Sequence, residues 1–166
     1  RKSELDALQS QINPHFLYNT LDSITWMVEG GRNDEAVFMI SQLAKFFRIS
    51  LSQGCTVISI KDELQHAESY MNIQKVRYKN SFSIVFDIDP DVCSCCTVKL
   101  ILQPILENAI AYGVSGMDDC GEIRVTGRIQ EGSVILSVKD NGRRRRCASF
   151  LRTAAGSVNM APGSAL

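Results

Sequence analysis

A histidine with a carboxamide one turn further along a predicted helix is the first group in this sequence that can do chemistry. His15 follows Pro14, and Asn19 comes four residues later. Imidazole is a nucleophile near neutral pH and can accept a phosphoryl group. Side chains four residues apart share a helix face, so Asn19 can hold the ring or a transferring phosphate. The alternative is a histidine with a purely structural role, and this pair alone leaves both interpretations open.

Two more polar groups stand out from apolar surroundings. Glu107 and Asn108 are adjacent in a segment rich in Leu and Ile, where they either solvate a helix surface or supply oxygen atoms beside a magnesium–phosphate site. Residues 140–142 read Asp-Asn-Gly and follow an alternating strand pattern. That triplet is typical of a hairpin turn, but no alternating strand follows it, which weakens the turn interpretation.

The charge balance argues against nucleic-acid binding. The 166 residues contain 18 basic and 18 acidic side chains, but residues 143–166 carry five arginines and no acid. The first 142 residues are therefore net acidic, and the only basic cluster lies in the tail. No apolar run reaches the roughly 18 residues that a membrane span needs. The sequence opens without an initiator methionine, so we expect a cytoplasmic piece of a longer protein.

Six cysteines raise the question of a metal site. Cys93 and Cys96 have a Cys-x-x-Cys spacing, but a zinc site needs a second pair or nearby histidines, and the only histidines are His15 and His66. Free thiols in a reducing compartment are therefore the favoured interpretation.

The first 53 residues predict two helices. Apolar spacing indicates a helix over 4–29, which Pro14 should kink, and a second over 34–53, after the glycines at 30 and 31. The second helix has a seam of apolar residues at alternating spacings of three and four: Val37, Ile40, Ala44, Phe47 and Leu51. An antiparallel hairpin of this kind cannot bury both of its apolar faces alone. We therefore expect two copies to form a four-helix bundle.

The following residues predict an α+β unit. Helical spacing continues over 61–79, and alternation at 82–88 indicates a strand. An apolar helix is expected over 97–112, with its regular part kinked at or starting from Pro104. Strands at 123–129 and 134–138 flank a turn at Glu131-Gly132. The predicted organisation is a helical hairpin (1–53), an incomplete α/β-sandwich unit (54–142) and a tail (143–166).

Three segments together resemble one protein family. Residues 8–21 (LQSQINPHFLYNTL) resemble the phospho-acceptor box of the LytS-type sensor histidine kinases. Residues 103–110 (QPILENAI) resemble that family's N box, and residues 138–142 (VKDNG) resemble its first glycine box. The order and spacing of the segments also fit, as does the intervening segment 70–78 (YMNIQKVRY). The resemblance covers roughly residues 1–142.

The resemblance implies a set of roles. His15 would be autophosphorylated from ATP and would pass the phosphoryl group to an aspartate of a response-regulator receiver domain. Asn108 would ligate Mg²⁺, with Glu107 supporting it or acting as a base, while Asp140 would accept a hydrogen bond from the adenine amine. Gly142 would allow close approach to the base. The hairpin would form the homodimer, and the membrane would be reached only through segments outside this chain.

The sequence departs from the family at several places. Tyr112 stands where the family often has histidine, and Phe16 follows His15 where many other histidine kinases have an acid. After Gly142 the family's small-residue turn, lid and second glycine-rich box are replaced by four arginines and a small-residue stretch. This tail suggests an out-of-frame or engineered end, the alternative being a natural tail. We expect it to be disordered, or ordered only where it covers an exposed sheet surface.

Two rival functions follow from these departures. One is a catalytically inactive dimerisation and phospho-acceptor module, because the phosphates of ATP need backbone donors from a glycine-rich loop that nothing after Gly142 supplies. The other is an ATPase of the gyrase or chaperone class, against which the hairpin over 1–53 argues. His66, on the third helix and outside any such motif, would serve as a neutral control for His15.

Overall fold

A computed structural model describes residues 13–52, 56–118, 120–142, 148–154 and 157–159. The helices are α2 (Pro14–Glu29), α3 (Asn33–Ser50), α4 (Ile60–Arg77) and α5 (Leu102–Asn108), which runs into a π-helical turn, η2 (Ala109–Val114). A short 3₁₀ helix, η1, spans Pro90–Ser94. The predicted α+β class, with a helical hairpin ahead of an α/β unit, is confirmed.

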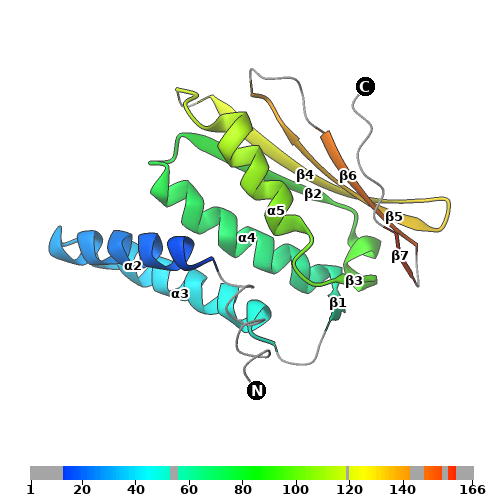
Figure 1. The fold of residues 1–166 in the computed structure, drawn as a ribbon, viewed down its shortest axis with the longest axis horizontal. Helices are drawn as coiled ribbons and strands as arrows, with labels where there is room; N and C mark the ends of the chain where they lie inside the picture. Colours follow the sequence, from blue (N-terminus) through cyan, green and yellow to red (C-terminus); the bar gives the residue numbers. More distant parts are fainter. Residues whose placement is uncertain (1–12, 53–55, 119, 143–147, 155–156, 160–166) are drawn as a thin grey trace.

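The main sheet has five strands in the order β2-β4-β5-β6-β7. They are β2 (Phe82–Ile88), β4 (Gly121–Gln130), β5 (Ser133–Asp140), β6 (Ala148–Ala154) and β7 (Ser157–Asn159). Strands β2 and β4 are parallel, and the later pairs are antiparallel. Figure 1 shows α4 and α5 against one face of this sheet, with the α2–α3 hairpin packed on the far side of α4.

The hairpin begins at Pro14 rather than continuing through it. Asn13 has an extended backbone, with φ −69° and ψ 111°, and its side chain accepts a hydrogen bond from the His15 amide at 3.0 Å. Proline suits the first helical position because its missing N–H has no partner to lose there. The prediction that one helix runs over 4–29 with a kink at Pro14 is therefore wrong at Asn13, where the backbone is extended and not helical. Residues 1–12 lie outside the described part of the chain.

The buried face of α3 is not the predicted seam. Met39, Leu43 and Phe46 are buried against the rest of the chain, whereas Val37 and Ile40 are exposed. Phe46 is the centre of an aromatic cluster, defined by its ring contacts to Phe16 at 5.0 Å, His66 at 4.5 Å and Tyr70 at 6.2 Å. Aromatic pairs at these separations add to the stabilisation from area burial. The hairpin is thereby packed onto α4, and the predicted seam is left on the outside.

The helix expected over 97–112 starts later than predicted. Strand β3 (Cys96–Val98) pairs antiparallel with β1 (Val57–Ser59), so Thr97 and Val98 lie in a two-stranded sheet. Helix α5 then begins at Leu102, which places Pro104 in its first turn, where a missing N–H is tolerated. Of the two alternatives for Pro104, a kink within a longer helix or a helix that starts near the proline, the structure has the second.

A buried carboxylate of α4 fixes the start of α5. Glu63 is fully buried and accepts hydrogen bonds from the backbone amides of Leu100 at 2.9 Å and Leu102 at 3.0 Å. Leu100 has φ +65°, a conformation that costs energy for a side chain of its kind. Burial raises the pKa of the Glu63 carboxyl, while the backbone hydrogen bonds act in the opposite direction. Glu63 therefore holds a strained turn and the helix that follows it.

The tail contributes strands where the structure describes it. β6 pairs with β5 over seven residue pairs, from Ser133↔Ala154 to Lys139↔Ala148, and β7 pairs with β6. The expectation of disorder does not hold for 148–154 and 157–159. These residues instead match the other expectation, that the tail is ordered where it covers an exposed part of the sheet. Strand β6 pairs with the edge of β5 that would otherwise be unpaired.

Replacing Glu63 with glutamine should lower the free energy of unfolding by about 1–3 kcal/mol, because an amide can accept only one of the two backbone hydrogen bonds. Glu68→Gln is the matched control, since Glu68 is exposed on the same helix. Urea denaturation followed by circular dichroism measures both variants. Equal stability of the Glu63 variant and the wild type would contradict this role.

Candidate functional site

His15 lies on the surface at the first turn of α2. Its side chain is exposed, while its neighbour Phe16 is buried in the aromatic cluster, 5.1 Å from the Tyr70 ring. Asn19 follows one turn later and is half-buried. The burial of Phe16 thus fixes the rotation of α2 and leaves the His15 imidazole accessible to a reaction partner.

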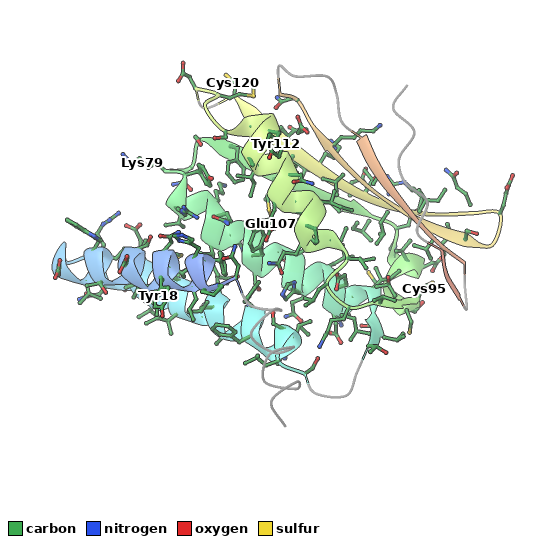
Figure 2. The ribbon with its side chains drawn as sticks, in the orientation of Figure 1. Tyr18, Lys79, Cys95, Glu107, Tyr112 and Cys120 are labelled. Atoms are coloured by element: carbon green, nitrogen blue, oxygen red, sulfur yellow. The ribbon has the colours of Figure 1, made fainter. Side chains whose placement is uncertain are left out.

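Glu107 and Asn108 point in different directions. Glu107 is half-buried, accepts a hydrogen bond from Gln103 at 3.0 Å and lies between α4 and α5 (Figure 2). Its charge acts on Tyr70 of α4, whose pKa is raised mainly by burial and further by Glu107. Asn108 is exposed, and so is Tyr112 one turn later, at 72%. Of these three predicted site residues, Asn108 and Tyr112 are therefore the ones exposed to a ligand on the outside of this helix.

The end of β5 lies tightly against the end of η2. The Gly142 amide donates to Asp140 Oδ1 at 2.9 Å. A Cβ atom on Gly142 would lie 2.1 Å from the Gly113 carbonyl oxygen, and one on Gly113 would lie 2.5 Å from Asp140 Cγ. Neither position can hold a side chain. We call Gly113, Asp140 and Gly142 the glycine cradle.

Asn141 fastens the glycine cradle to the sheet. Its side-chain oxygen accepts from the Glu122 amide at 2.7 Å, and its Nδ2 donates to the Cys120 carbonyl at 2.8 Å. The same residue's amide donates to the Glu122 carbonyl. The Asp-Asn-Gly triplet is therefore not a tight two-residue turn, because Asn141 is held against the start of β4. The expectation that no strand follows the triplet is wrong, since β6 pairs antiparallel with β5 from Ala148 onwards.

Comparison with known proteins gives the family. A histidine kinase family model matches residues 3–82. Sensor histidine kinase YesM of Bacillus subtilis (strain 168) is 37% identical over 142 residues, which cover 86% of this chain and 25% of that protein. Sensor protein LytS of Staphylococcus saprophyticus is 33% identical over 144 residues, covering 86% of this chain and 24% of that protein. The chain belongs to the LytS-type sensor histidine kinases.

The match covers part of these proteins. This chain spans about a quarter of the length of YesM and of LytS. The same holds for sensor histidine kinase YpdA of Escherichia coli (strain K12), which is 34% identical over 142 residues, covering 85% of this chain. A solved histidine kinase domain from Erythrobacter litoralis EL346 aligns with TM-score 0.43 and 14% identity, over 84% of this chain and 70% of that one. A likeness at this level does not bear on function.

The histidine kinase motifs lie on two sides of α4. α2, with His15 in its first turn, packs against α4 through Phe16, and α5, which leads to the glycine cradle, packs against α4 from the other side (Figure 1). The structure brings Tyr112, Asp140 and Gly142 to one end of the α/β unit, with Asn108 one turn before Tyr112. His15 and Asn19 are apart from them on the hairpin. The chemical roles assigned to these residues from sequence stay predictions.

Sequence reasoning missed Gly113 as a site residue. The signal was present, because a glycine directly after Tyr112 interrupts a segment with good helix formers. Its role depends on contact with Asp140, which is 27 positions later, and local periodicity carries no information about such a contact.

His66 is not the neutral control that the sequence suggested. It is fully buried, its ring stacks on Phe46, and its Nε2 lies 2.9 Å from Ser50 Oγ. Because the Ser50 hydroxyl donates to the Phe46 carbonyl at 3.0 Å, Nε2 must carry the proton that joins the two side chains. Nδ1 is then an unprotonated acceptor with no partner among the described residues.

The other sequence predictions on this part of the molecule concern cysteines and membrane spans. Cys93, Cys95, Cys96 and Cys120 are free thiols, and the described residues contain no cluster of acid, cysteine and histidine side chains that could hold a metal ion. Cys55 and Cys147 lie outside the described residues. Within the described part of the chain, no helix is long and apolar enough to span a membrane.

The buried His66 predicts acid sensitivity. Burial, with a smaller effect of Lys99, lowers the pKa of His66 from 6.5 to about 4. Between these two pH values the unfolded chain takes up a proton that the folded chain does not. The free energy of unfolding should therefore fall as the pH drops from 6.5 towards 4, by up to about 1.4 kcal/mol per pH unit.

His66→Gln should remove most of that slope, while His15→Gln, which leaves the buried histidine in place, should retain it. Urea denaturation at half-unit pH steps measures the slope for each variant. An unchanged slope in His66→Gln would show that another group is responsible.

Proposed function

We propose that this chain carries the phospho-acceptor hairpin and part of the ATP-binding unit of a two-component sensor histidine kinase. The observation that carries the proposal is the pairing of an exposed His15, within a matched phospho-acceptor motif, with a glycine cradle that presents the carboxylate of Asp140. By analogy with its relatives, the chain would be the cytoplasmic portion of a membrane sensor.

The glycine cradle fits a flat base. Because Gly113 and Gly142 have no side chains, the end of η2 and the end of β5 can touch, and this contact holds the Asp140 carboxylate in place for a base. Asp140 keeps one carboxylate oxygen engaged with the Gly142 amide, and its second oxygen is free to accept from an exocyclic amine such as that of adenine. A carboxylate acceptor favours adenine over guanine, whose corresponding ring position carries an oxygen.

The exposed side chains of Asn108 and Tyr112 suit the phosphate end of a nucleotide and its magnesium ion. Mg²⁺ is bound in proteins by one or two oxygen ligands together with phosphates, and the Asn108 side-chain oxygen is such a ligand. ATP with Mg²⁺ would supply the phosphoryl group in a charge-neutralised form. The Tyr112 hydroxyl can donate to a phosphate oxygen, which is the part that histidine often has in the family. Glu107, turned towards α4, would hold the helix rather than act as a base at the magnesium ion.

His15 would act as the nucleophile and carrier. An imidazole nitrogen would attack the γ-phosphorus, ADP would leave, and the phosphoryl group would next pass to a receiver-domain aspartate. The exposed position of His15 suits both encounters, because each partner must reach the same nitrogen. Because α2, which carries His15, and α5, which leads to the glycine cradle, pack against different sides of α4 (Figure 1), this step would need the hairpin of a second subunit or a change in packing.

The predicted homodimer has a candidate surface. We call it the seam face: Val37, Ile40 and Leu51, which are 65%, 53% and 42% exposed. Leu21 and Val28 of α2 are also exposed, at 45% and 54%. Covering one such side chain contributes about 1.5–3 kcal/mol, so pairing of two seam faces would stabilise a four-helix bundle.

The second candidate function, an inactive dimerisation and phospho-acceptor module, rests on the sequence after Gly142. The family's glycine-rich box is replaced there by four arginines. Exposed arginine charges are screened beyond about 8–10 Å at physiological salt and do not replace oriented backbone donors. Whether the chain phosphorylates His15 by itself distinguishes the two functions.

Ile40→Glu with Leu51→Glu should turn the dimer into a monomer, because charges would replace apolar contacts of the seam face. Both positions are exposed within one chain, so the fold itself should persist by circular dichroism. Ile129→Glu, at an equally exposed isoleucine on β4, is the control and should leave the dimer intact. Analytical ultracentrifugation measures the mass, and a dimer of unchanged affinity in the double variant would contradict the bundle.

The kinase function is tested in a chain that has the family's glycine-rich segment restored after Gly142. His15→Gln should abolish acid-labile phosphorylation from ATP and Mg²⁺ while leaving nucleotide binding unchanged. Asp140→Asn should abolish both, and Asp118→Asn, an exposed acid outside the glycine cradle, should affect neither. Radiolabel that persists in His15→Gln would show that another residue is the acceptor.

The chain as it stands should bind ATP weakly or not at all, since the described residues offer the phosphates the Tyr112 hydroxyl but no glycine-rich loop of backbone donors. Calorimetry with ATP and Mg²⁺ measures the affinity. A low-micromolar dissociation constant that is lost in Asp140→Asn would show that the glycine cradle suffices, and would count against the inactive-module function.

A further inference from the structure

A hollow lies where the loop end of the hairpin meets the end of α4. Its volume is about 470 Å³, in the range of small-molecule sites. Trp26 of α2 and Arg32 of the α2–α3 loop line one side, and Arg77, Lys79 and Asn80 line the other. Figure 2 labels Lys79 at the end of α4 that faces the loop end of the hairpin. We call this hollow the basic pocket.

The basic pocket carries unpaired positive charge. Arg32 is paired with Glu35 at 3.4 Å. Neither Arg77 nor Lys79 has an ion-pair partner within the described part of the chain, although the Arg77 guanidinium lies 5.8 Å from the Tyr78 ring centroid. Glu35 also lines the hollow, but it is paired with Arg32, so Arg77 and Lys79 leave the hollow with a net positive charge that attracts anions. The charges therefore point to an anionic ligand.

The turn that presents these groups is fixed. Lys79 and Asn80 have φ +54° and +56°, and their amides donate to the Val76 and Lys75 carbonyls at 3.0 and 2.8 Å. These backbone hydrogen bonds fix the positions of the Lys79 and Asn80 Cα atoms beside the hollow. The Asn80 carboxamide can add a neutral donor to the two cations.

Trp26 supplies the apolar wall. It is the single tryptophan of the chain, and 71% of its surface is exposed although it lines the basic pocket. An indole face beside cations suits a ligand that has a flat apolar part next to its charges. Neither Asp140 nor Asn108 lines this pocket, so it is separate from the nucleotide face.

We propose that the basic pocket binds a small organic anion that carries at least two negative charges and a flat ring. The ring would lie on Trp26, and the charged group would lie between Arg77 and Lys79. Because Trp26 belongs to the hairpin and the cations lie at the end of α4 and directly after it, the bound ligand would join the hairpin to α4. It would stabilise the packed arrangement of hairpin and α4 in proportion to its occupancy.

The probe is phenyl phosphate, a dianion with one aromatic ring, and the signal is the fluorescence of Trp26, which has no other tryptophan to obscure it. The proposal predicts a saturable change, at lower concentration for phenyl phosphate than for inorganic phosphate, and none for benzyl alcohol at the same concentrations. Phenyl phosphate should also raise the midpoint of thermal unfolding of the chain.

Variants separate the pocket from general charge effects. Arg77→Gln and Lys79→Gln should each weaken phenyl phosphate binding about tenfold, the effect of removing one charged hydrogen-bond partner. Lys45→Gln, an exposed lysine of α3 outside the pocket, and Asp140→Asn, in the glycine cradle, should leave it unchanged. Because the readout is phenyl phosphate binding, the test does not depend on kinase activity.

A change that grows linearly without saturating would overturn the proposal, and so would equal binding by the wild type and Lys79→Gln. Equal affinity for inorganic phosphate and phenyl phosphate would show that Trp26 does not bind the ring, and would contradict the proposal that the ligand carries one. Binding that is lost in Asp140→Asn would place the probe at the nucleotide face instead.

Discussion

The architecture depends on α4 being buried on two sides at once. Ten of its 18 residues are buried, more than a helix covers when only one face meets a core. Towards the hairpin, the His66–Ser50 contact is joined by hydrogen bonds from Asn72 to Gln42 at 3.2 Å and from Arg48 to Gln65 at 2.8 Å. Towards α5, Glu63 binds the backbone of the strained turn at Leu100. The same helix thus holds both halves of the molecule.

This shared helix explains how the chemical groups are distributed. Phe16 fixes the rotation of α2 through Tyr70 of α4 and so turns His15 outwards. Glu63 sets where α5 begins, and therefore which of its residues face outwards as Asn108 and Tyr112 do. Glu107, next in the chain to Asn108, is turned inwards towards Tyr70. His15 on one side of α4, and Asn108 and Tyr112 on another, are thus all presented to solvent, as the proposed phosphoryl transfer between separately moving parts requires.

Strands β2, β4 and β5 were predictable from local sequence, and the contacts between distant segments were not. Alternation from Phe82 to Ile88 gave the bounds of β2 because each side chain's face is set by its own position. The start of α5 was wrong because Thr97 pairs with Ile58, a partner almost 40 residues earlier. Helix α3 has two apolar faces, and periodicity does not tell which of them is buried within the chain. The glycine cradle needed Gly113 beside Asp140, a contact that only the folded chain defines.

The most direct test of the two-sided burial of α4 is native-state hydrogen exchange in rising urea, following the amides of α3 and α4. If the helices share one core through Phe46, His66 and Tyr70, the slowest amides of both should open with the same free energy, as one cooperative unit. If the hairpin is instead a separate domain, the α3 amides will open at a lower free energy while those of α4 stay protected. That result would contradict the account, because α4 would then be stable without the face that α3 covers.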